Sequence, residues 1–234
     1  PYAGRYERSN TTASAVELAN GKLRTIDEIV AKPTKKTIKL SGRLMTFRSH
    51  GKLSFGQLQD FSGKVQVCFM QDFLGAEKYK FLKKVDMADH IGVEGEMFVT
   101  RHGEATLLVY ELTMLSKTLR PLPEKWHGVK DQETRYRQRY LDTTMNRESM
   151  DRFVFRSNFV KALREFYWAE GFIELETPVL ENTSSGAVAK PFLTHHNALD
   201  IDMYLRIAAG ELWQKMACVG GFEKTFEVAR CFRN

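Results

Sequence analysis

Apolar side chains alternate with polar ones between residues 36 and 115, and this period of two predicts a small β-barrel. Ile38, Leu40 and Leu44 show the alternation, which indicates strands with one buried face. Turns containing glycine separate several of the runs. Strands are expected at 36–47, 53–61, 64–70, 90–100 and 105–115, with a helix at 75–85 after the third strand. Three strands, a helix and two strands is the order of an OB fold, a small all-β barrel that binds oligonucleotides.

The rest of the chain predicts an arm, a connector and an α+β region. Residues 1–36 are polar and rich in serine and threonine, and an amphipathic stretch at 25–30 predicts one small helix there. Closely spaced prolines interrupt any regular element, so 121–145 is expected to link the barrel, at 37–120, to a second region at 146–234. In that region helices are expected at 150–170 and 211–219. Strands are expected at 171–180, where Pro178 breaks the strand, and at 203–208 and 225–234.

The basic charge of the chain is concentrated in its first half. Composition is ordinary for a globular protein, with 43% hydrophobic and 27% charged residues and a net charge of +6. Residues 1–120 hold 19 basic and 13 acidic side chains, whereas residues 121–234 hold 16 of each. Within 31–64, eight basic residues stand against Asp60 alone. This pattern predicts an anion-facing surface, and the open alternative is a solvated basic face without a partner.

Cysteines, apolar runs and histidines exclude several classes of protein. The three cysteines lack CxxC spacing, which argues against a disulfide framework and a thiolate zinc site. No apolar run approaches the roughly 18 residues of a membrane helix, and no signal peptide is recognisable, so we expect no membrane association and a cytoplasmic location. His195 and His196 are adjacent and would face opposite sides of a strand, which favours structural roles over a shared metal ion.

Several long strings in the second half resemble one family of enzymes. GFIELETPVL, at 171–180, resembles motif 1 of class II aminoacyl-tRNA synthetases, and FEVARCFRN, at 226–234, resembles motif 2. KPFLTHHNALDIDMYLRIA, at 190–208, and the junction LRPLPEKWHGVKDQETRYRQRYLD, at 119–142, are similar to lysyl-tRNA synthetases in particular. The resemblance covers nearly the whole chain. It implies an anticodon-binding OB-fold domain followed by the first part of an antiparallel α+β catalytic domain.

The resemblance implies an ATP-dependent ligase that attaches lysine to tRNA(Lys). In that family lysine and ATP form lysyl-adenylate, and lysine then passes to the 3′ end of the tRNA; Mg²⁺ accompanies ATP, and the enzyme is a homodimer. The motif 2 glutamate and motif 3 would follow Asn234, so we expect a fragment that does not catalyse alone, with the Mg²⁺ ligands outside it. Two other interpretations stay open, a non-enzymatic tRNA-binding module and the synthetase-like region of a lipid-lysylating enzyme.

Three residues of the second half receive roles from the resemblance. Arg233 matches the motif 2 arginine, which binds ATP and stabilises the charge that builds up on the α-phosphate. Glu211 matches the carboxylate that binds the lysine α-ammonium, and Gly186 matches a glycine whose backbone lies against the lysine. The family usually has one residue between the Ile-Ala of the preceding strand and this glutamate, whereas this chain has two, Ala209 and Gly210. Without the resemblance, the three would be an exposed arginine, a helix-dipole partner and a loop glycine.

Four residues of the expected barrel match anticodon contacts of the family. Phe55 matches an aromatic ring on which a base stacks, Arg48 and Gln66 match polar contacts to the central uridine, and Glu104 matches a further base contact. Without the resemblance, Phe55 would be a half-buried strand residue and Gln66 an ordinary exposed one. In motif 1, Pro178 is implied to lie at the dimer interface. Four aromatic residues of the long helix are expected in the core and at that interface: Phe153, Phe155, Phe159 and Phe166.

Overall fold

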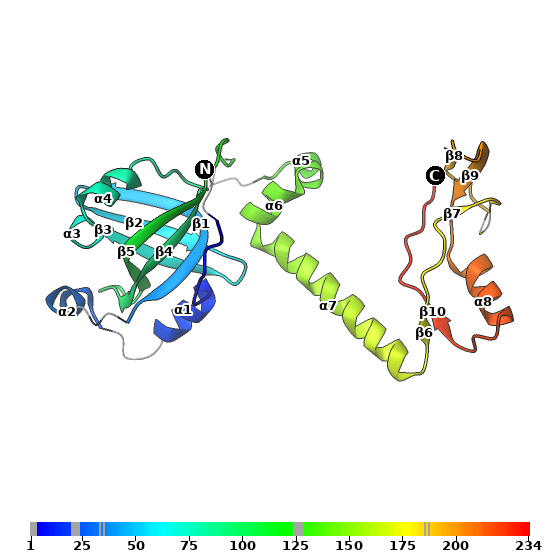
Figure 1. The fold of residues 1–234 in the computed structure, drawn as a ribbon, viewed down its shortest axis with the longest axis horizontal. Helices are drawn as coiled ribbons and strands as arrows, with labels where there is room; N and C mark the ends of the chain where they lie inside the picture. The colour runs from blue at the N-terminus through cyan, green and yellow to red at the C-terminus, as the bar shows by residue number, and fades with distance from the viewer. Residues whose placement is uncertain are drawn as a thin grey trace. The chain divides into compact units, whose positions relative to one another are not determined.

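The computed structural model describes residues 4–19, 24–32, 34, 36–123, 129–184, 186 and 188–234. The chain divides into two compact units, Pro1–Arg137 and Gln138–Asn234, each held together by its own contacts (Figure 1). This division falls within the connector expected at 121–145. Part of that connector, 124–128, lies outside the described residues.

The first unit contains a closed five-stranded barrel, which confirms the OB fold expected from the sequence (Figure 1). The strands pair in the order β1-β2-β3-β5-β4; β3 and β5 are parallel and the other neighbours are antiparallel. Two short helices, α3 (Gln71–Leu74) and α4 (Ala76–Leu82), replace the single helix expected at 75–85. Closure gives every strand two neighbours. The strands are β1 (Ile38–His50), β2 (Leu53–Gln59), β3 (Lys64–Met70), β4 (His90–Val99) and β5 (Ala105–Ser116).

Apolar side chains that alternate along the strands fill the barrel. Leu40, Leu44 and Phe69 have no exposed surface. A bulge between Leu44 and Thr46 on β1 shifts the alternation by one residue, so Phe47 packs on the core with its ring edge-on to Phe69. The bulge therefore turns the next polar residues of β1 to the outer surface of the barrel.

The N-terminal arm folds onto the barrel. The small helix expected at 25–30 is present as α2 (Ile26–Ala31), and a helix that was not expected, α1 (Thr12–Ala19), precedes it. Ala15 of α1 is fully buried in the barrel core. Asp60, in the β2–β3 turn, accepts hydrogen bonds from Thr12 N at 3.0 Å and Thr12 Oγ1 at 2.6 Å. Tertiary contacts thus hold α1, and its serine- and threonine-rich sequence gave little helical signal.

The second unit begins with the helices α6 (Arg139–Met145) and α7 (Arg147–Ala169). The long helix starts three residues before the expected Met150, and Gly171, at φ 80°, follows its end as predicted. The expectation that the phenylalanines of α7 lie in a core is wrong for the described residues; their place at an interface stays a prediction. Their exposed fractions are Phe153 48%, Phe155 73%, Phe159 59% and Phe166 59%.

The strands of the second unit agree with the sequence prediction only in part. The strand expected at 171–180 is broken around Pro178, as predicted, because proline has no N–H to donate. The strand expected at 225–234 pairs over its first two residues. The strand expected at 203–208 is shifted toward the N-terminus. An antiparallel sheet has the order β7-β9-β8, and β10 pairs in parallel with β6. The strands are β6 (Ile173–Glu174), β7 (Leu180–Glu181), β8 (Leu193–His196), β9 (Ile201–Leu205) and β10 (Thr225–Phe226).

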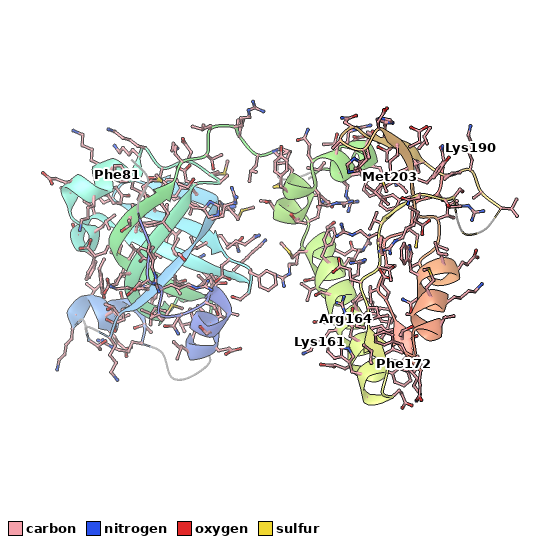
Figure 2. The ribbon with its side chains drawn as sticks, turned by 45° about the vertical axis from the view of Figure 1, so that its right-hand side comes forward. Phe81, Lys161, Arg164, Phe172, Lys190 and Met203 are labelled. Carbon is pink, nitrogen blue, oxygen red and sulfur yellow. The ribbon has the colours of Figure 1, made fainter. Side chains whose placement is uncertain are left out.

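Aromatic and ionic contacts join α7 to the β6-β10 pair. The ring of Tyr167 stacks on Phe226, with ring centroids 4.8 Å apart, and meets Phe172 edge-on at 5.2 Å. Arg164 Nε donates to Glu174 Oε1 at 2.7 Å; Arg164 and Phe172 are labelled in Figure 2. These contacts fix the end of the long helix against the strand that carries the motif 1 string.

Candidate functional site

A cavity of about 590 Å³ on the outside of the barrel brings together all four barrel residues expected to contact an anticodon. Arg48 comes from β1, Phe55 from β2 and Gln66 from β3, while Glu104 lies in the β4–β5 loop. Residues distant in sequence therefore meet at one site. The lining also includes polar residues that sequence reasoning did not select: Thr46, His50, Gln57, Thr100 and His102.

The register of the strands explains this convergence. Arg48 is the direct cross-strand partner of Phe55, so the two residues lie side by side on the same face of the barrel. Two residues along β2 from Phe55, and on the same face, Gln57 is the direct partner of Gln66. Gln66 is in turn the partner of Thr106 on β5. Directly opposed side chains on one face lie about 5 Å apart at Cβ. The pairing of the strands therefore determines the relative positions of the side chains that line the cavity.

The amide of Gln66 is held in one orientation. Its Nε2 donates to Glu104 Oε2 at 2.7 Å, and its Oε1 accepts from Thr106 Oγ1 at 2.8 Å. A carboxylate only accepts, so the nitrogen of the amide must face Glu104. The loop that carries Glu104 is closed by two bonds to Thr100, from Thr100 N to Glu104 O at 3.0 Å and from Glu104 N to Thr100 Oγ1 at 3.1 Å. One N–H and one oxygen lone pair of Gln66 remain for a ligand.

Phe55 rests on a second apolar cluster outside the barrel interior. It is half-buried and packs against a group that includes Ile29 of α2, Cys68 and Phe98. Burial raises the pKa of the Cys68 thiol to about 12, so this residue behaves as a small apolar side chain rather than as a thiolate. The helix α2, from the arm, therefore helps to support the ring from beneath. A ring anchored in this way costs little entropy when a base stacks on it.

The anion-facing surface expected from the basic stretch at 31–64 stays a prediction. Of its described basic residues, Arg48 lines the cavity. Lys39 pairs with Glu94 at 3.5 Å, and burial lowers the pKa of Arg43, whose Nη1 donates to Ala88 O at 2.9 Å. Lys35 lies outside the described residues. The strand alternation and the bulge separate cations that are close in sequence.

In the second unit the structure brings Gly186 close to Glu211. A Cβ on Gly186, whose φ is 89°, would lie 3.5 Å from Glu211 Oε2 and 3.0 Å from Ala208 Cβ. A side chain here would be strained and crowded, so glycine is required. The helix expected at 211–219 starts one residue early with a π-helical turn, η1 (Gly210–Gln214), and continues as α8 (Lys215–Val219). Such turns accommodate an extra residue in a helix and often occur at functional sites.

Sequence reasoning missed Arg206, a buried arginine that joins three segments. Its guanidinium is 3% exposed; Nη2 lies 2.9 Å from Glu227 Oε1, Nη1 donates to Thr177 Oγ1 at 2.7 Å, and Nε donates to Arg230 O at 2.9 Å. Burial alone would raise the pKa of Glu227, but hydrogen bonds from Thr177 and Arg206 lower it below its ordinary value. The sequence feature that could have revealed Arg206 is its position as the single charged residue within the apolar string YLRIA.

Arg233 and Pro178 lie in two of the segments that Arg206 joins. Arg233 is exposed and makes no hydrogen bond or ion pair within the described part of the chain, while its neighbour Phe232 donates its backbone N–H to Arg206 O at 2.9 Å. Pro178 is exposed, and its carbonyl accepts a long hydrogen bond from Arg206 Nη1 at 3.5 Å. The motif 1 and motif 2 strings are therefore joined by one side chain.

No cluster of three or more His, Cys, Asp or Glu side chains suited to a metal ion occurs among the described residues. His195 Nδ1 lies 2.9 Å from Asp202 Oδ1, and His196 Nδ1 accepts from Leu199 N at 3.2 Å. Both histidines thus make local contacts around the β8–β9 turn. No helix in the described residues has the length and apolar character needed to cross a membrane.

Two family models match the chain. Residues 38–115 match the OB-fold nucleic acid binding domain of tRNA anticodon recognition, and residues 131–234 match the tRNA synthetases of class II for D, K and N. The first match contains the barrel and its cavity. The second contains the π-turn, the Arg206 network and both motif strings. Together, the fold and these matches define a class II aminoacyl-tRNA synthetase.

Curated relatives identify one family within the class II aminoacyl-tRNA synthetases. The lysine–tRNA ligase of Carboxydothermus hydrogenoformans is 48% identical over 234 residues, which is all of this chain and 46% of the relative. Those of Syntrophomonas wolfei and Streptococcus thermophilus are 47% and 48% identical, again across the whole chain and 45% and 46% of their own length. This chain belongs to the lysyl-tRNA synthetase family, and it spans about half the length of the relatives it matches.

Proposed function

We propose that this chain serves the attachment of lysine to tRNA(Lys) in protein synthesis. A lysine carboxylate oxygen attacks the α-phosphorus of ATP, the bond to the β-phosphate oxygen breaks, and pyrophosphate leaves. A ribose hydroxyl at the 3′ end of the tRNA then attacks the carbonyl carbon of lysyl-adenylate and AMP leaves. The observation that carries the proposal is the barrel cavity, which gathers Arg48, Phe55, Gln66 and Glu104 in a chain of this family.

In this proposal the cavity reads the lysine anticodon. Single-stranded RNA is recognised by stacking of splayed bases and by hydrogen bonds to their edges. Phe55 supplies the stacking face, and the oriented amide of Gln66 offers one donor and one acceptor to the edge of the central uridine. Arg48, beside the ring, adds a cation that a base or phosphate oxygen accepts from. Glu104 orients Gln66 and offers its remaining lone pairs to a neighbouring base.

The second unit supplies part of the lysine and ATP sites in this proposal. Glu211 binds the lysine α-ammonium, and the nearby backbone of Gly186 lies against the substrate. Arg233 binds the α-phosphate, where its bidentate charge stabilises the transition state more than the ground state. Arg206 acts as a positioning residue, because it ties the segment that carries Arg233 to Thr177 of the motif 1 string.

Several further properties belong to the same proposal. ATP arrives as its Mg²⁺ complex, and no step is assigned to a metal ligand of this chain. The whole protein acts as a homodimer in the cytoplasm, with Pro178 and the exposed phenylalanines of α7 at the subunit interface. The 234-residue chain alone is expected to be inactive, and lysine-dependent exchange of pyrophosphate into ATP by this polypeptide would contradict that.

The proposal is tested with the complete product of the gene that encodes this chain. Exchange of labelled pyrophosphate into ATP is expected with lysine and not with aspartate or asparagine, which other members of the matched class use. Charging is expected for a tRNA(Lys) transcript and not for a transcript with an altered anticodon. Exchange that is independent of lysine would overturn the activation step. Equal charging of both transcripts would overturn the role of the cavity.

A further inference from the structure

We propose that Gln57 is a second base-contacting residue of the barrel cavity and that it adds affinity without adding discrimination. The inference rests on the proposed function, since it concerns the same RNA. Gln57 lines the cavity on β2 and is the direct cross-strand partner of Gln66. Within the described residues its side chain makes no hydrogen bond, in contrast to Gln66. Two amides therefore stand side by side, one oriented by the protein and one free to rotate.

Register places Gln57 next to the stacking ring. Phe55 and Gln57 are two residues apart on β2, so their side chains project from the same face. Gln66 lies diagonally across from Phe55, whose direct partner on β3 is Cys68. Diagonal neighbours are about 7 to 8 Å apart, so Gln66 reaches toward the ring from the next strand. A base that stacks on Phe55 thus presents its edge to both amides.

The chemistry of the two amides differs because only one is oriented. The Watson–Crick edge of uracil has an acceptor, a donor and an acceptor in sequence, whereas that of cytosine has a donor and two acceptors. Gln66 cannot exchange its nitrogen and oxygen without losing its bonds to Glu104 and Thr106, so it distinguishes the two edges. Gln57 can turn its amide to match either base. It therefore strengthens binding of both bases to a similar extent.

The test uses the 234-residue chain and two RNA hairpins that carry the lysine anticodon with uridine or cytidine at its central position. Binding is measured by fluorescence anisotropy at fixed salt concentration, because RNA affinity depends strongly on salt. Gln57→Met keeps the length of the side chain and removes its amide. We expect it to weaken both hairpins by about three- to tenfold, the effect of one neutral hydrogen bond, with their ratio unchanged. Gln66→Ala should reduce the ratio.

Controls separate this inference from the proposed function. Gln59→Met changes the next outward residue of β2, which does not line the cavity, and should leave both affinities unchanged. Wild-type affinity of Gln57→Met for both hairpins, or a loss with one hairpin alone, would overturn the role given to Gln57 while leaving anticodon binding in place. If the wild-type chain bound the lysine hairpin no better than a hairpin with an unrelated loop, anticodon recognition itself would fail.

Discussion

The barrel unit and the second unit bury different kinds of side chain. The barrel is filled by apolar residues such as Leu58, Phe69 and Leu107, none of which has exposed surface. In the described part of the second unit, Phe226 is the one buried large apolar side chain, and the other buried positions are polar. Hydrophobic burial therefore dominates in the barrel, whereas most of the buried positions of the second unit are hydrogen-bonded polar groups. Those polar positions are Asp142, Ser149, Glu181 and Arg206.

The kind of side chain that each unit buries determines where a functional site can lie in it. Because the barrel has its own core and no open edge, its outer surface can hold a site whose geometry is set by strand register. In the second unit, Arg206 orders the backbone around Thr177 and Arg230. Loss of a single polar group there should affect the arrangement of both motif strings.

The largest expected effect is on the barrel core. Phe69→Ala removes a fully buried ring and should lower the free energy of unfolding of the barrel by about 3 to 5 kcal/mol, because a cavity remains. Phe159→Ala, which truncates an exposed ring of α7, is the matched control and should change the free energy of unfolding by about 0.5 kcal/mol or less. Urea unfolding followed by circular dichroism gives both values. Similar losses from the two variants would contradict the comparison between the units.

Next in size is the loss of the buried guanidinium in the second unit. Arg206→Gln leaves the Glu227 carboxylate buried without its charged partner and should destabilise this unit by about 3 kcal/mol. Hydrogen exchange followed by mass spectrometry should show faster exchange in 177–181 and 226–232 and unchanged exchange in the barrel. Arg230→Gln is the control, because its side chain is exposed and only its carbonyl accepts from Arg206. Unchanged hydrogen exchange in Arg206→Gln would show that Arg206 does not hold these segments together.

A smaller effect is expected where the arm joins the barrel. Burial alone would raise the pKa of Asp60, but hydrogen bonds from Ser62 and Thr12 lower it to about 2, against an ordinary value of 3.8. The folded-state pKa is the lower one, so Asp60 stabilises the fold fully above pH 3.8 and loses this effect as pH falls toward 2. Asp60→Asn should cost about 1 to 2 kcal/mol at neutral pH.

The pH dependence distinguishes this role of Asp60 from simple packing. Thermal unfolding of the wild type and Asp60→Asn is compared from pH 6 to pH 2, and the two stabilities should converge toward the acid end. Ser14→Ala, in the same helix α1, does not touch Asp60 and serves as the control. A difference between wild type and Asp60→Asn that stays constant across this range would show that the charge of Asp60 contributes nothing.

The sequence predicted the barrel better than the second unit, for physical reasons. Alternation along β1 to β5 reports a buried face directly, and the four cavity residues were found through family motifs. The helix α1 was missed because contacts distant in sequence, such as Asp60 with Thr12, stabilise it. Strand lengths in the second unit were wrong, since pairing depends on partners that local pattern does not reveal. The π-helical turn that begins at Gly210 was not predicted, because no periodic pattern of apolar residues indicates such a turn.

If the barrel cavity binds the lysine anticodon, replacement of its aromatic ring must weaken RNA binding. The affinity of the chain for an RNA hairpin with the lysine anticodon is measured for wild type, Phe55→Ala and Phe61→Ala. Phe61 is 65% exposed in the β2–β3 turn and does not line the cavity. We predict that Phe55→Ala weakens binding by about 1 to 3 kcal/mol, the value of one stacked base, and that Phe61→Ala leaves it unchanged. Equal affinities of wild type and Phe55→Ala would contradict the account.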